Sequence, residues 1–206
     1  MTGHGFRSPF PDYDVLDKWD TPSWNDQTRE AVAERLHEVP ERRFFDAEEW
    51  ATLEAVCARI VPQPDRPEGP VPIVPWIDRK LDRNEGDGYR YEGMPPMRDA
   101  WRMGLRGIDD ESRARHGQRF RELAPEQQDE VLRRIQQEDV TSEVWSRMPP
   151  KRFFDGTLLR HVVSVYYAHP AAWNEIGFGG PAAPRGYARL GFDRRDPWEA
   201  EEKAGG

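Results

Sequence analysis

The chain has 206 residues and a formal net charge of −8 at pH 7, which argues against nucleic-acid binding because phosphate contacts need a positive surface. Charged residues make up 33% of the chain and hydrophobic residues only 36%, yet the sequence contains 8 Trp, 9 Phe and 6 Tyr. Large aromatic side chains bury much area each, so we expect a core that is small in residue number and rich in rings.

The single cysteine, Cys57, excludes an internal disulfide framework and a cysteine-based zinc or iron–sulfur site. Its place on the apolar side of an expected helix favours a buried, inert thiol over a nucleophile. The N-terminus lacks the apolar region of a signal peptide, and no run of residues is apolar enough to span a membrane. Arg42 and Arg43 are followed by Asp46 and Glu49 where a twin-arginine signal needs hydrophobic residues. We therefore expect a cytoplasmic protein.

The first 22 residues are rich in proline and aromatic residues and show no helical period. We expect an extended arm whose aromatic residues dock either on its own domain or on a partner. The residues expected to make these contacts are Phe6, Phe10, Tyr13 and Trp19. Thr21 or Ser23 is then expected to cap a short helix that carries Val32, Leu36 and Val39 on one side.

The clearest helix start in the chain is the capping-box pair Asp46 and Glu49, followed by a buried stripe that ends at Pro62. The segment from Pro62 to Pro75 contains six prolines and predicts an extended, polyproline-like connector. A short amphipathic segment follows, with Trp76, Ile77 and Leu81. Residues 82–93 predict a polar loop, in which Asp82, Asn84 and Asp87 lack the spacing of an EF-hand calcium site.

Two longer helices are expected after this loop. Pro95 and Pro96 begin a helix that ends near Gly117, and Pro125 begins the next one at its first position. No segment shows strand alternation bounded by hairpin turns, so the fold is expected to be all-α. We expect an N-terminal arm and short helix over 1–43, a compact helical domain with long proline- and glycine-rich connectors over 44–192, and a charged, flexible tail over 193–206.

The segment from Phe153 to Tyr187 is the main candidate for function. It opens as a helix with one apolar face, formed by Phe154, Leu158, Val162, Val165 and Tyr166. Pro170 is expected to stop this helix near His169. The glycines and prolines that follow predict a shaped loop, and long loops of this kind usually carry function. The residues of this loop expected to contact a partner are His169, Pro170, Trp173, Asn174, Glu175, Gly177, Phe178, Gly180 and Tyr187.

Two chemical interpretations of this segment are weaker. Gly177 to Ala182 matches G-x-G-x-x-A, but a dinucleotide fingerprint needs a preceding strand and a helix that starts within it. His169, Asn174 and Glu175 form a polar cluster that suggests a general base or a metal ligand, or alternatively side chains that fix the loop by hydrogen bonding. His161 is expected to be a semi-buried histidine with its polar atoms satisfied.

The order of these features resembles the gluconate 2-dehydrogenase subunit 3 family over about Phe44 to Tyr187. The resemblance rests on the helix that ends in Arg59-Ile60-Val61-Pro62, on Trp76-Ile77-Asp78, on Gly104-Leu105 to Phe120, on Tyr166-Tyr167-Ala168-His169-Pro170, on Asn174 and on Ile176-Gly177-Phe178. Members commonly carry two glycines before the Asn, where this chain has Ala172 and Trp173. Many also begin with a twin-arginine signal.

The resemblance implies a non-catalytic small subunit that binds and stabilises, or helps mature, an FAD-dependent sugar or polyol dehydrogenase. The large subunit of such a complex is of the glucose–methanol–choline (GMC) type and holds FAD, so this chain would carry no catalytic, cofactor or metal residue. A transient chaperone that leaves after flavin insertion is a related expectation. The alternative is a stand-alone enzyme or small-ligand binder that uses His169, Asn174 and Glu175.

Overall fold

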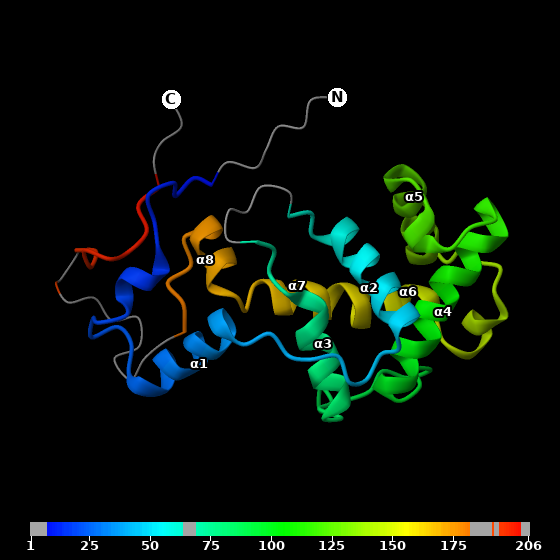
Figure 1. Ribbon diagram of the computed structural model, residues 1–206, viewed down its shortest axis with the longest axis horizontal. Coiled ribbons are helices and arrows are strands. Elements are labelled where there is room, and N and C mark those ends of the chain that lie inside the picture. Colours follow the sequence, from blue (N-terminus) through cyan, green and yellow to red (C-terminus); the bar gives the residue numbers. More distant parts are fainter. Residues whose placement is uncertain (1–7, 64–68, 182–190, 192–193, 203–206) are drawn as a thin grey trace. The chain divides into compact units, whose positions relative to one another are not determined.

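The computed structural model describes residues 8–63, 69–181, 191 and 194–202 (Figure 1). Within these ranges every regular element is a helix, which confirms the all-α fold. The α-helices are α1 (Asp26–His37), α2 (Ala47–Ile60), α3 (Ile73–Asp82), α4 (Met97–His116), α5 (Pro125–Gln136), α6 (Pro150–Phe153), α7 (Arg160–Tyr166) and α8 (Pro170–Ile176). Short 3₁₀ turns occupy Val15–Lys18, Phe120–Glu122 and Glu143–Arg147, and a π-helical turn, Phe154–Leu159, joins α6 to α7.

The chain folds as two compact units, which differ from the division expected from the sequence. The larger unit is Pro40–Val165, and the smaller unit combines Met1–Val39 with Tyr166–Gly206. The expected domain 44–192 therefore divides at the end of α7. The reason is that Trp173 packs with Val15 and Trp24 in the core of the smaller unit.

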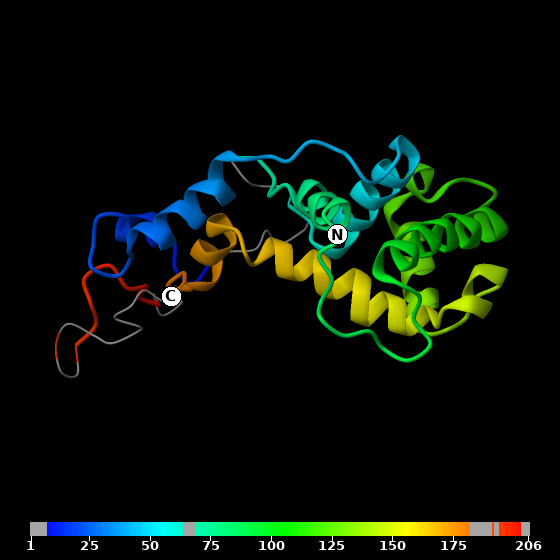
Figure 2. The ribbon, with the colours of Figure 1, turned by 90° about the horizontal axis from the view of Figure 1, so that it is seen from below.

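In the larger unit, α2 packs against α3, α4 and α5, and α4 also contacts α6 (Figures 1 and 2). The core is rich in rings, as the composition predicts. Trp101, Phe120 and Phe153 are fully buried. Gly104 permits one of these contacts, because a Cβ atom at this position would lie 2.0 Å from Phe153 Cζ. The missing side chain thus lets the ring of Phe153 lie directly against α4.

The turn that leads into α2 is held by a buried carboxylate. Asp78 on α3 has no exposed surface and accepts hydrogen bonds from three successive backbone N–H groups, those of Arg43 (2.7 Å), Phe44 (3.1 Å) and Phe45 (2.8 Å). The capping box of Asp46 and Glu49 is present immediately afterwards, as predicted. Two sets of side-chain to backbone bonds therefore fix where α2 begins.

One expectation about the larger unit needs correction, and two are confirmed. The proline connector is shorter than predicted, because α3 already begins at Ile73 and includes Pro75 in its first turn, where proline is tolerated. Gly117 ends α4 in the left-handed conformation, with φ of 73°, as expected. Cys57 is buried, as expected.

In the smaller unit, the predicted arm is folded rather than extended. Val15, Trp24, Val32 and Trp173 form its core, and Tyr13, Leu16, Trp19 and Leu36 pack around them. The cap of α1 is Asn25, which accepts a hydrogen bond from Thr28 N, so the expectation of Thr21 or Ser23 is wrong. Val39 lies beyond the end of α1 and is 64% exposed, which corrects its expected place on the buried side.

The described part of the tail, residues 194–202, is held by side-chain contacts, in contrast to the flexible tail expected over 193–206. Asp196 is buried, and Trp198 Nε1 donates to Ser23 Oγ at 2.8 Å. Glu199 pairs with the buried Lys18 at 3.1 Å. Across the described ranges, no helix has both the length and the apolar character needed to cross a membrane.

Candidate interaction surface

The segment after α7 is a helix where the sequence predicted a loop. Pro170 occupies the first position of α8, where its missing N–H is not needed and its fixed φ suits a helix. His169 is the N-cap, and its Nδ1 accepts a hydrogen bond from Ala171 N at 3.2 Å. Pro170 thus ends one helix and begins the next. The loop interpretation is correct only from Gly177 onwards within the described residues.

The arm is joined to α8 through Asn174. The Asn174 side-chain oxygen accepts from Val15 N at 2.8 Å, and its amide nitrogen donates to Asp14 Oδ1 at 3.1 Å. Ser8 Oγ donates to Glu175 O at 2.9 Å, and Tyr13 OH donates to Phe178 O at 3.2 Å. The arm therefore docks on its own chain, which is one of the two alternatives that the sequence left open.

Two glycines let the arm approach the end of α8. Gly177 has a φ of +65°, and a Cβ atom there would lie 2.7 Å from the ring of Phe10. Gly180 has a φ of +74°, and its Cβ would lie 3.0 Å from Trp24. Both the left-handed backbone and the close ring contact require glycine. Gly177 and Gly180 of this segment therefore serve packing, and the element that precedes the G-x-G-x-x-A segment is a helix instead of the strand of a dinucleotide site.

The remaining residues of the predicted site divide into buried and exposed ones. Pro170 and Trp173 are buried, and Trp173 Nε1 donates to Tyr167 O at 2.6 Å. Trp19 is half-buried against the core of the smaller unit. Phe6 and Tyr187 lie outside the described residues. Most of the predicted contact residues thus build the smaller unit itself, and only part of the set faces outward.

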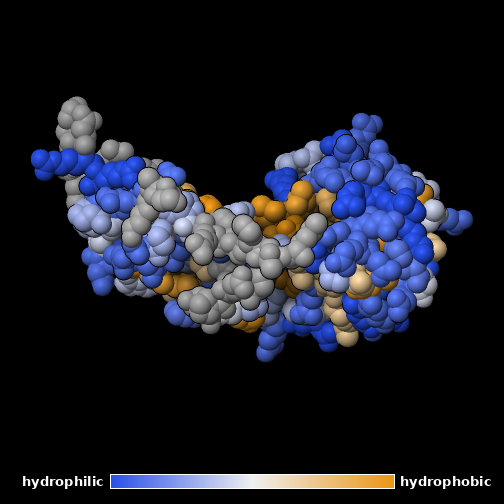
Figure 3. Space-filling model, turned by 90° about the horizontal axis from the view of Figure 1, so that it is seen from above, coloured by the Kyte–Doolittle hydropathy of each residue, from blue (hydrophilic) through white to orange (hydrophobic). Residues whose placement is uncertain are grey.

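Three large apolar side chains remain exposed around α8. On the face drawn in Figure 3, the described residues are mostly hydrophilic. Tyr167, Ile176 and Phe178 are 44%, 45% and 40% exposed. Trp173 links Tyr167 and Phe178, because it donates to Tyr167 O, its carbonyl accepts from Phe178 N at 3.0 Å, and its ring packs edge-on against the ring of Phe178. Ile176 is the last residue of α8, two residues before Phe178. We call Tyr167, Ile176 and Phe178 the α8 surface. Sequence reasoning missed Tyr167, although its place beside the buried Tyr166 on α7 predicts an outward direction.

His169, Asn174 and Glu175 each have a structural role. His169 caps α8, Asn174 binds the arm, and Glu175 accepts a hydrogen bond from Tyr166 OH at 2.6 Å. In the ranges that the structure covers, no three His, Cys, Asp or Glu residues gather as metal ligands would. His161 is 5% exposed and bonds through Nδ1 to Thr157 O at 2.6 Å, as the prediction of a satisfied histidine requires.

Comparison with protein families gives one match. The sequence model described as Gluconate 2-dehydrogenase subunit 3 matches residues 47–180, which is more than half of the chain. The chain belongs to this family. Comparison with curated proteins and with solved structures returned no match.

The gluconate 2-dehydrogenase subunit 3 match begins at α2 and ends just after α8, so it includes the α8 surface and leaves out the arm. The structure gives a role to the family-like residues within this range. Asp78 of Trp76-Ile77-Asp78 holds the turn before α2, and Tyr166 and His169 fix α8 at its two ends. Trp173, where family members commonly have glycine, fills the core against the arm. The family's name denotes a subunit of a dehydrogenase.

Proposed function

We propose that this chain is a non-catalytic accessory subunit that binds and stabilises, or helps mature, the large subunit of an FAD-dependent GMC-type sugar or polyol dehydrogenase. The observation that carries the proposal is the family match over residues 47–180. In this assignment FAD and the reacting groups belong to the large subunit, and the two subunits assemble in the cytoplasm.

The α8 surface supports this role on physical grounds. Exposed large apolar and aromatic side chains around one helix commonly mark a protein interface. The three residues sit on a backbone that the arm and Trp173 hold in place, so little conformational entropy is lost when a partner covers them. A rigid apolar surface of this kind is suited to a stable subunit contact.

The structural roles of His169, Asn174 and Glu175 argue for the accessory role over a stand-alone enzyme. A general base must reach the proton it removes, and these three side chains are directed to backbone groups and to Tyr166 instead. No observation on the described residues favours turnover by this chain alone.

The experiment is co-expression with the dehydrogenase large subunit that co-purifies with the chain or is encoded beside it. The wild-type chain is expected to give a stoichiometric complex on a sizing column, which also separates a permanent subunit from a transient chaperone. Ile176→Asp and Phe178→Asp place a charge on the α8 surface and should weaken the complex by about tenfold or more each.

The matched control is Val39→Asp, which changes another exposed apolar residue of the smaller unit, 64% exposed and outside the α8 surface. This variant should bind like wild type. The proposed function is wrong if the wild-type chain and large subunit elute separately, or if purified chain alone turns over a sugar or polyol. If Ile176→Asp, Phe178→Asp and Val39→Asp all weaken the complex equally, the α8 surface is not part of the interface.

A further inference from the structure

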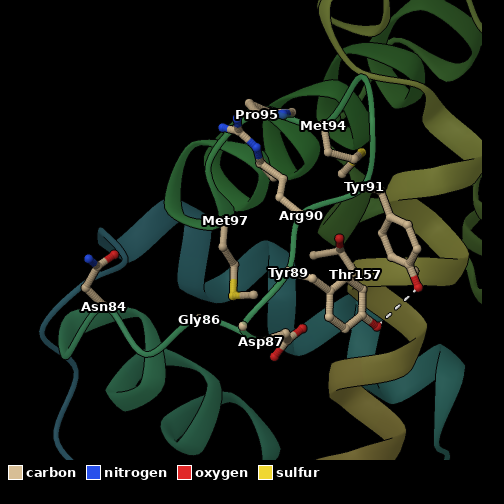
Figure 4. A pocket seen from close by; sticks show the side chains of 13 residues that line it. Asn84, Gly86, Asp87, Tyr89, Arg90, Tyr91, Met94, Pro95, Met97 and Thr157 are labelled. Carbon is tan, nitrogen blue, oxygen red and sulfur yellow. Dashed lines mark hydrogen bonds between the residues drawn. The ribbon is translucent and has the colours of Figure 1, made fainter.

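A second group of exposed aromatic residues lies in the larger unit, on the loop between α3 and α4. Tyr89 and Tyr91 are 54% and 37% exposed, while most aromatic residues of the chain are buried or half-buried. Their rings pack edge to face at 5.2 Å, and their hydroxyl oxygens are 3.3 Å apart (Figure 4). This loop is polar, so burial of apolar area does not explain why it presents two tyrosines.

The loop is fixed by a polar cluster of Lys80, Asp87 and His161, of which His161 is buried and the other two are half-buried. Lys80 Nζ lies 2.5 Å from Asp87 Oδ1 and 3.1 Å from His161 Nε2. Burial lowers the pKa of His161, and a neutral ring with its proton on Nδ1 donates to Thr157 O while Nε2 accepts from Lys80. Burial favours protonation of Asp87, but the hydrogen bond from Lys80 and the nearby cations outweigh it and lower its pKa. The carboxylate therefore stays charged and anchors the loop.

Each tyrosine carries a guanidinium against its ring. Arg152 lies over Tyr91, with 4.7 Å between its Cζ and the ring centre, and Arg160 lies over Tyr89 at 5.5 Å. Arg160 also donates a hydrogen bond to Tyr89 OH and lies 3.9 Å from Asp87. We call Tyr89, Tyr91, Arg152 and Arg160 the tyrosine–arginine surface. Stacking restrains all four side chains before any partner binds.

The helix beneath this surface is shaped to receive Tyr91. Gly156 lies in the π-helical turn Phe154–Leu159, and a Cβ atom there would lie 3.3 Å from Tyr91 Cε2. Glycine thus lets the ring lie close to the helix, between Arg152 and Arg160 along the chain. π-Helical turns occur frequently at functional sites, where they shift side chains out of ordinary helical register.

Two open hollows share Tyr91 in their lining. The one seen in Figure 4 has a volume of 390 Å³ and is lined by Asp87, Tyr89, Met97 and Thr157, among others. The other has a volume of 730 Å³ and is lined by Lys151, Arg152 and Arg160 together with Glu92, Glu138 and Asp155. Tyr91 and Gly156 line both hollows. Because the two hollows share these residues, neighbouring side chains of one bound segment can enter both.

The chain segment that carries Arg152 and Arg160 is locally basic, although the whole chain is acidic. From Arg147 to Arg160 there are four basic residues and one acidic residue, in a protein of net charge −8. The acidic residue, Asp155, already accepts a hydrogen bond from Gln136 at 3.0 Å. Among the described residues, Lys151 and Arg152 form none of the ion pairs within 4.0 Å. These cations are available to a partner's carboxylates.

We propose that the tyrosine–arginine surface binds an acidic segment of the partner dehydrogenase subunit, with partner carboxylates against Arg152 and Arg160 and neighbouring side chains in the two hollows. The proposal rests on the proposed function for the identity of the partner. Tyrosine and arginine are the residues most enriched at the energetic centres of protein interfaces. The hollows are open and lined by charged groups, whereas small-molecule sites are enclosed and mostly apolar, which favours a protein segment as the occupant.

The test is the Kd for the dehydrogenase subunit, measured by biolayer interferometry at low and high salt with wild-type chain, Arg152→Glu and Arg133→Glu. Arg152 lies over the Tyr91 ring and lines one hollow, and none of the polar contacts of Lys80, Asp87 and His161 involves it, so its reversal leaves that cluster intact. Arg133 is an exposed arginine of α5 that lines neither hollow, and Arg133→Glu changes the net charge by the same amount as Arg152→Glu. Arg152→Glu should raise Kd by about tenfold or more, with the difference shrinking at high salt, while Arg133→Glu should change Kd by less than about threefold.

Equal Kd values for the two variants would overturn the inference and leave the proposed function standing. If wild-type chain does not bind the dehydrogenase subunit at all, the proposed function fails, and an NMR titration with a hexaglutamate peptide tests the surface separately. Amide shifts at residues 84–94 and 151–160 that disappear in Arg152→Glu would support an acid-binding surface. No shifts there, or the same shifts with free glutamate at equal carboxylate concentration, would overturn it.

Discussion

Replacement of Asp78 by alanine should destabilise the larger unit strongly. The Asp78 carboxylate is fully buried and accepts the backbone N–H groups of Arg43, Phe44 and Phe45. Phe44 and Phe45 are themselves buried, so water cannot replace the lost acceptor at these two positions. A buried donor left unsatisfied costs about 1–3 kcal/mol. Two such donors, together with the third at Arg43, which is exposed so that water can replace part of its contact, predict a loss of about 3–5 kcal/mol.

The effect should spread from the turn to the core. The ring of Phe45 packs edge-on against Trp101 at 6.0 Å, and Arg102 donates to Phe44 O at 2.9 Å while lying over the Phe44 ring. A loss of 3–5 kcal/mol in a chain of this size lowers the melting temperature by on the order of 10 °C. The assay is thermal and urea unfolding followed by circular dichroism and by tryptophan fluorescence.

Asp82→Asn is the matched control, because Asp82 is an exposed carboxylate at the end of the same helix. It should change the unfolding free energy by less than about 0.5 kcal/mol. Asp78→Asn keeps one acceptor oxygen, so its loss of unfolding free energy should lie between those of Asp78→Ala and Asp82→Asn. A loss below 1 kcal/mol in Asp78→Ala would refute the reasoning, because it would mean that the three N–H groups find other partners at little cost.

Three further changes test other parts of the fold. Gly104→Ala should lower the unfolding free energy by about 3 kcal/mol in urea titrations, because its Cβ would overlap the buried Phe153 ring. Gly86→Ala should be nearly neutral, because its Cβ would lie 4.0 Å from the nearest heavy atom, Gly88 N, which is an ordinary contact distance. Asn174→Ala removes the contacts with Val15 N and Asp14, so limited proteolysis should cut residues 8–24 several times faster than in wild type; an unchanged rate would mean that the core contacts alone hold the arm. Burial, with a smaller contribution from Glu54, raises the pKa of the Cys57 thiol, so the unfolded state loses this proton at a lower pH than the folded state. The contribution of Cys57 to the unfolding free energy should therefore be fully present below the ordinary thiol pKa of about 8.5 and fall as pH rises above it. The urea midpoint of Cys57→Ala should accordingly fall less at alkaline pH than that of wild type.

Local signals predicted much of the larger unit. The capping box of Asp46 and Glu49, the left-handed Gly117 and the first-position Pro125 each act within one turn of their own helix, so the sequence around them suffices. The buried side of α2, including Cys57, follows from helical spacing in the same way. Such contacts need no knowledge of the rest of the chain.

The smaller unit could not be predicted in the same way, because its contacts join distant parts of the chain. Asn174 binds Val15, and Trp198 binds Ser23, across more than 150 residues. The sequence around Pro170 predicts a helix stop, although proline is equally suited to the first position of a new helix, and His169 supplies the cap. The capping role of His169 is the local signal that separates these alternatives.

The surfaces available for partners were only partly predictable. Ile176 and Phe178 lie in the segment singled out by its glycines, but Trp173 and Asn174 of the same segment are used within the smaller unit. Tyr89 and Tyr91 carry no sequence signal of their own, because their arrangement depends on Gly156 and Arg152, which lie about sixty residues further along the chain.

The most direct test of the accessory role is the flavin content, solubility and dehydrogenase activity of the large subunit produced with and without this chain. The proposed function predicts that the large subunit is soluble, flavin-loaded and active when the chain is present, and that these properties fall together when it is left out. A large subunit that is equally soluble, flavin-loaded and active by itself would contradict the account.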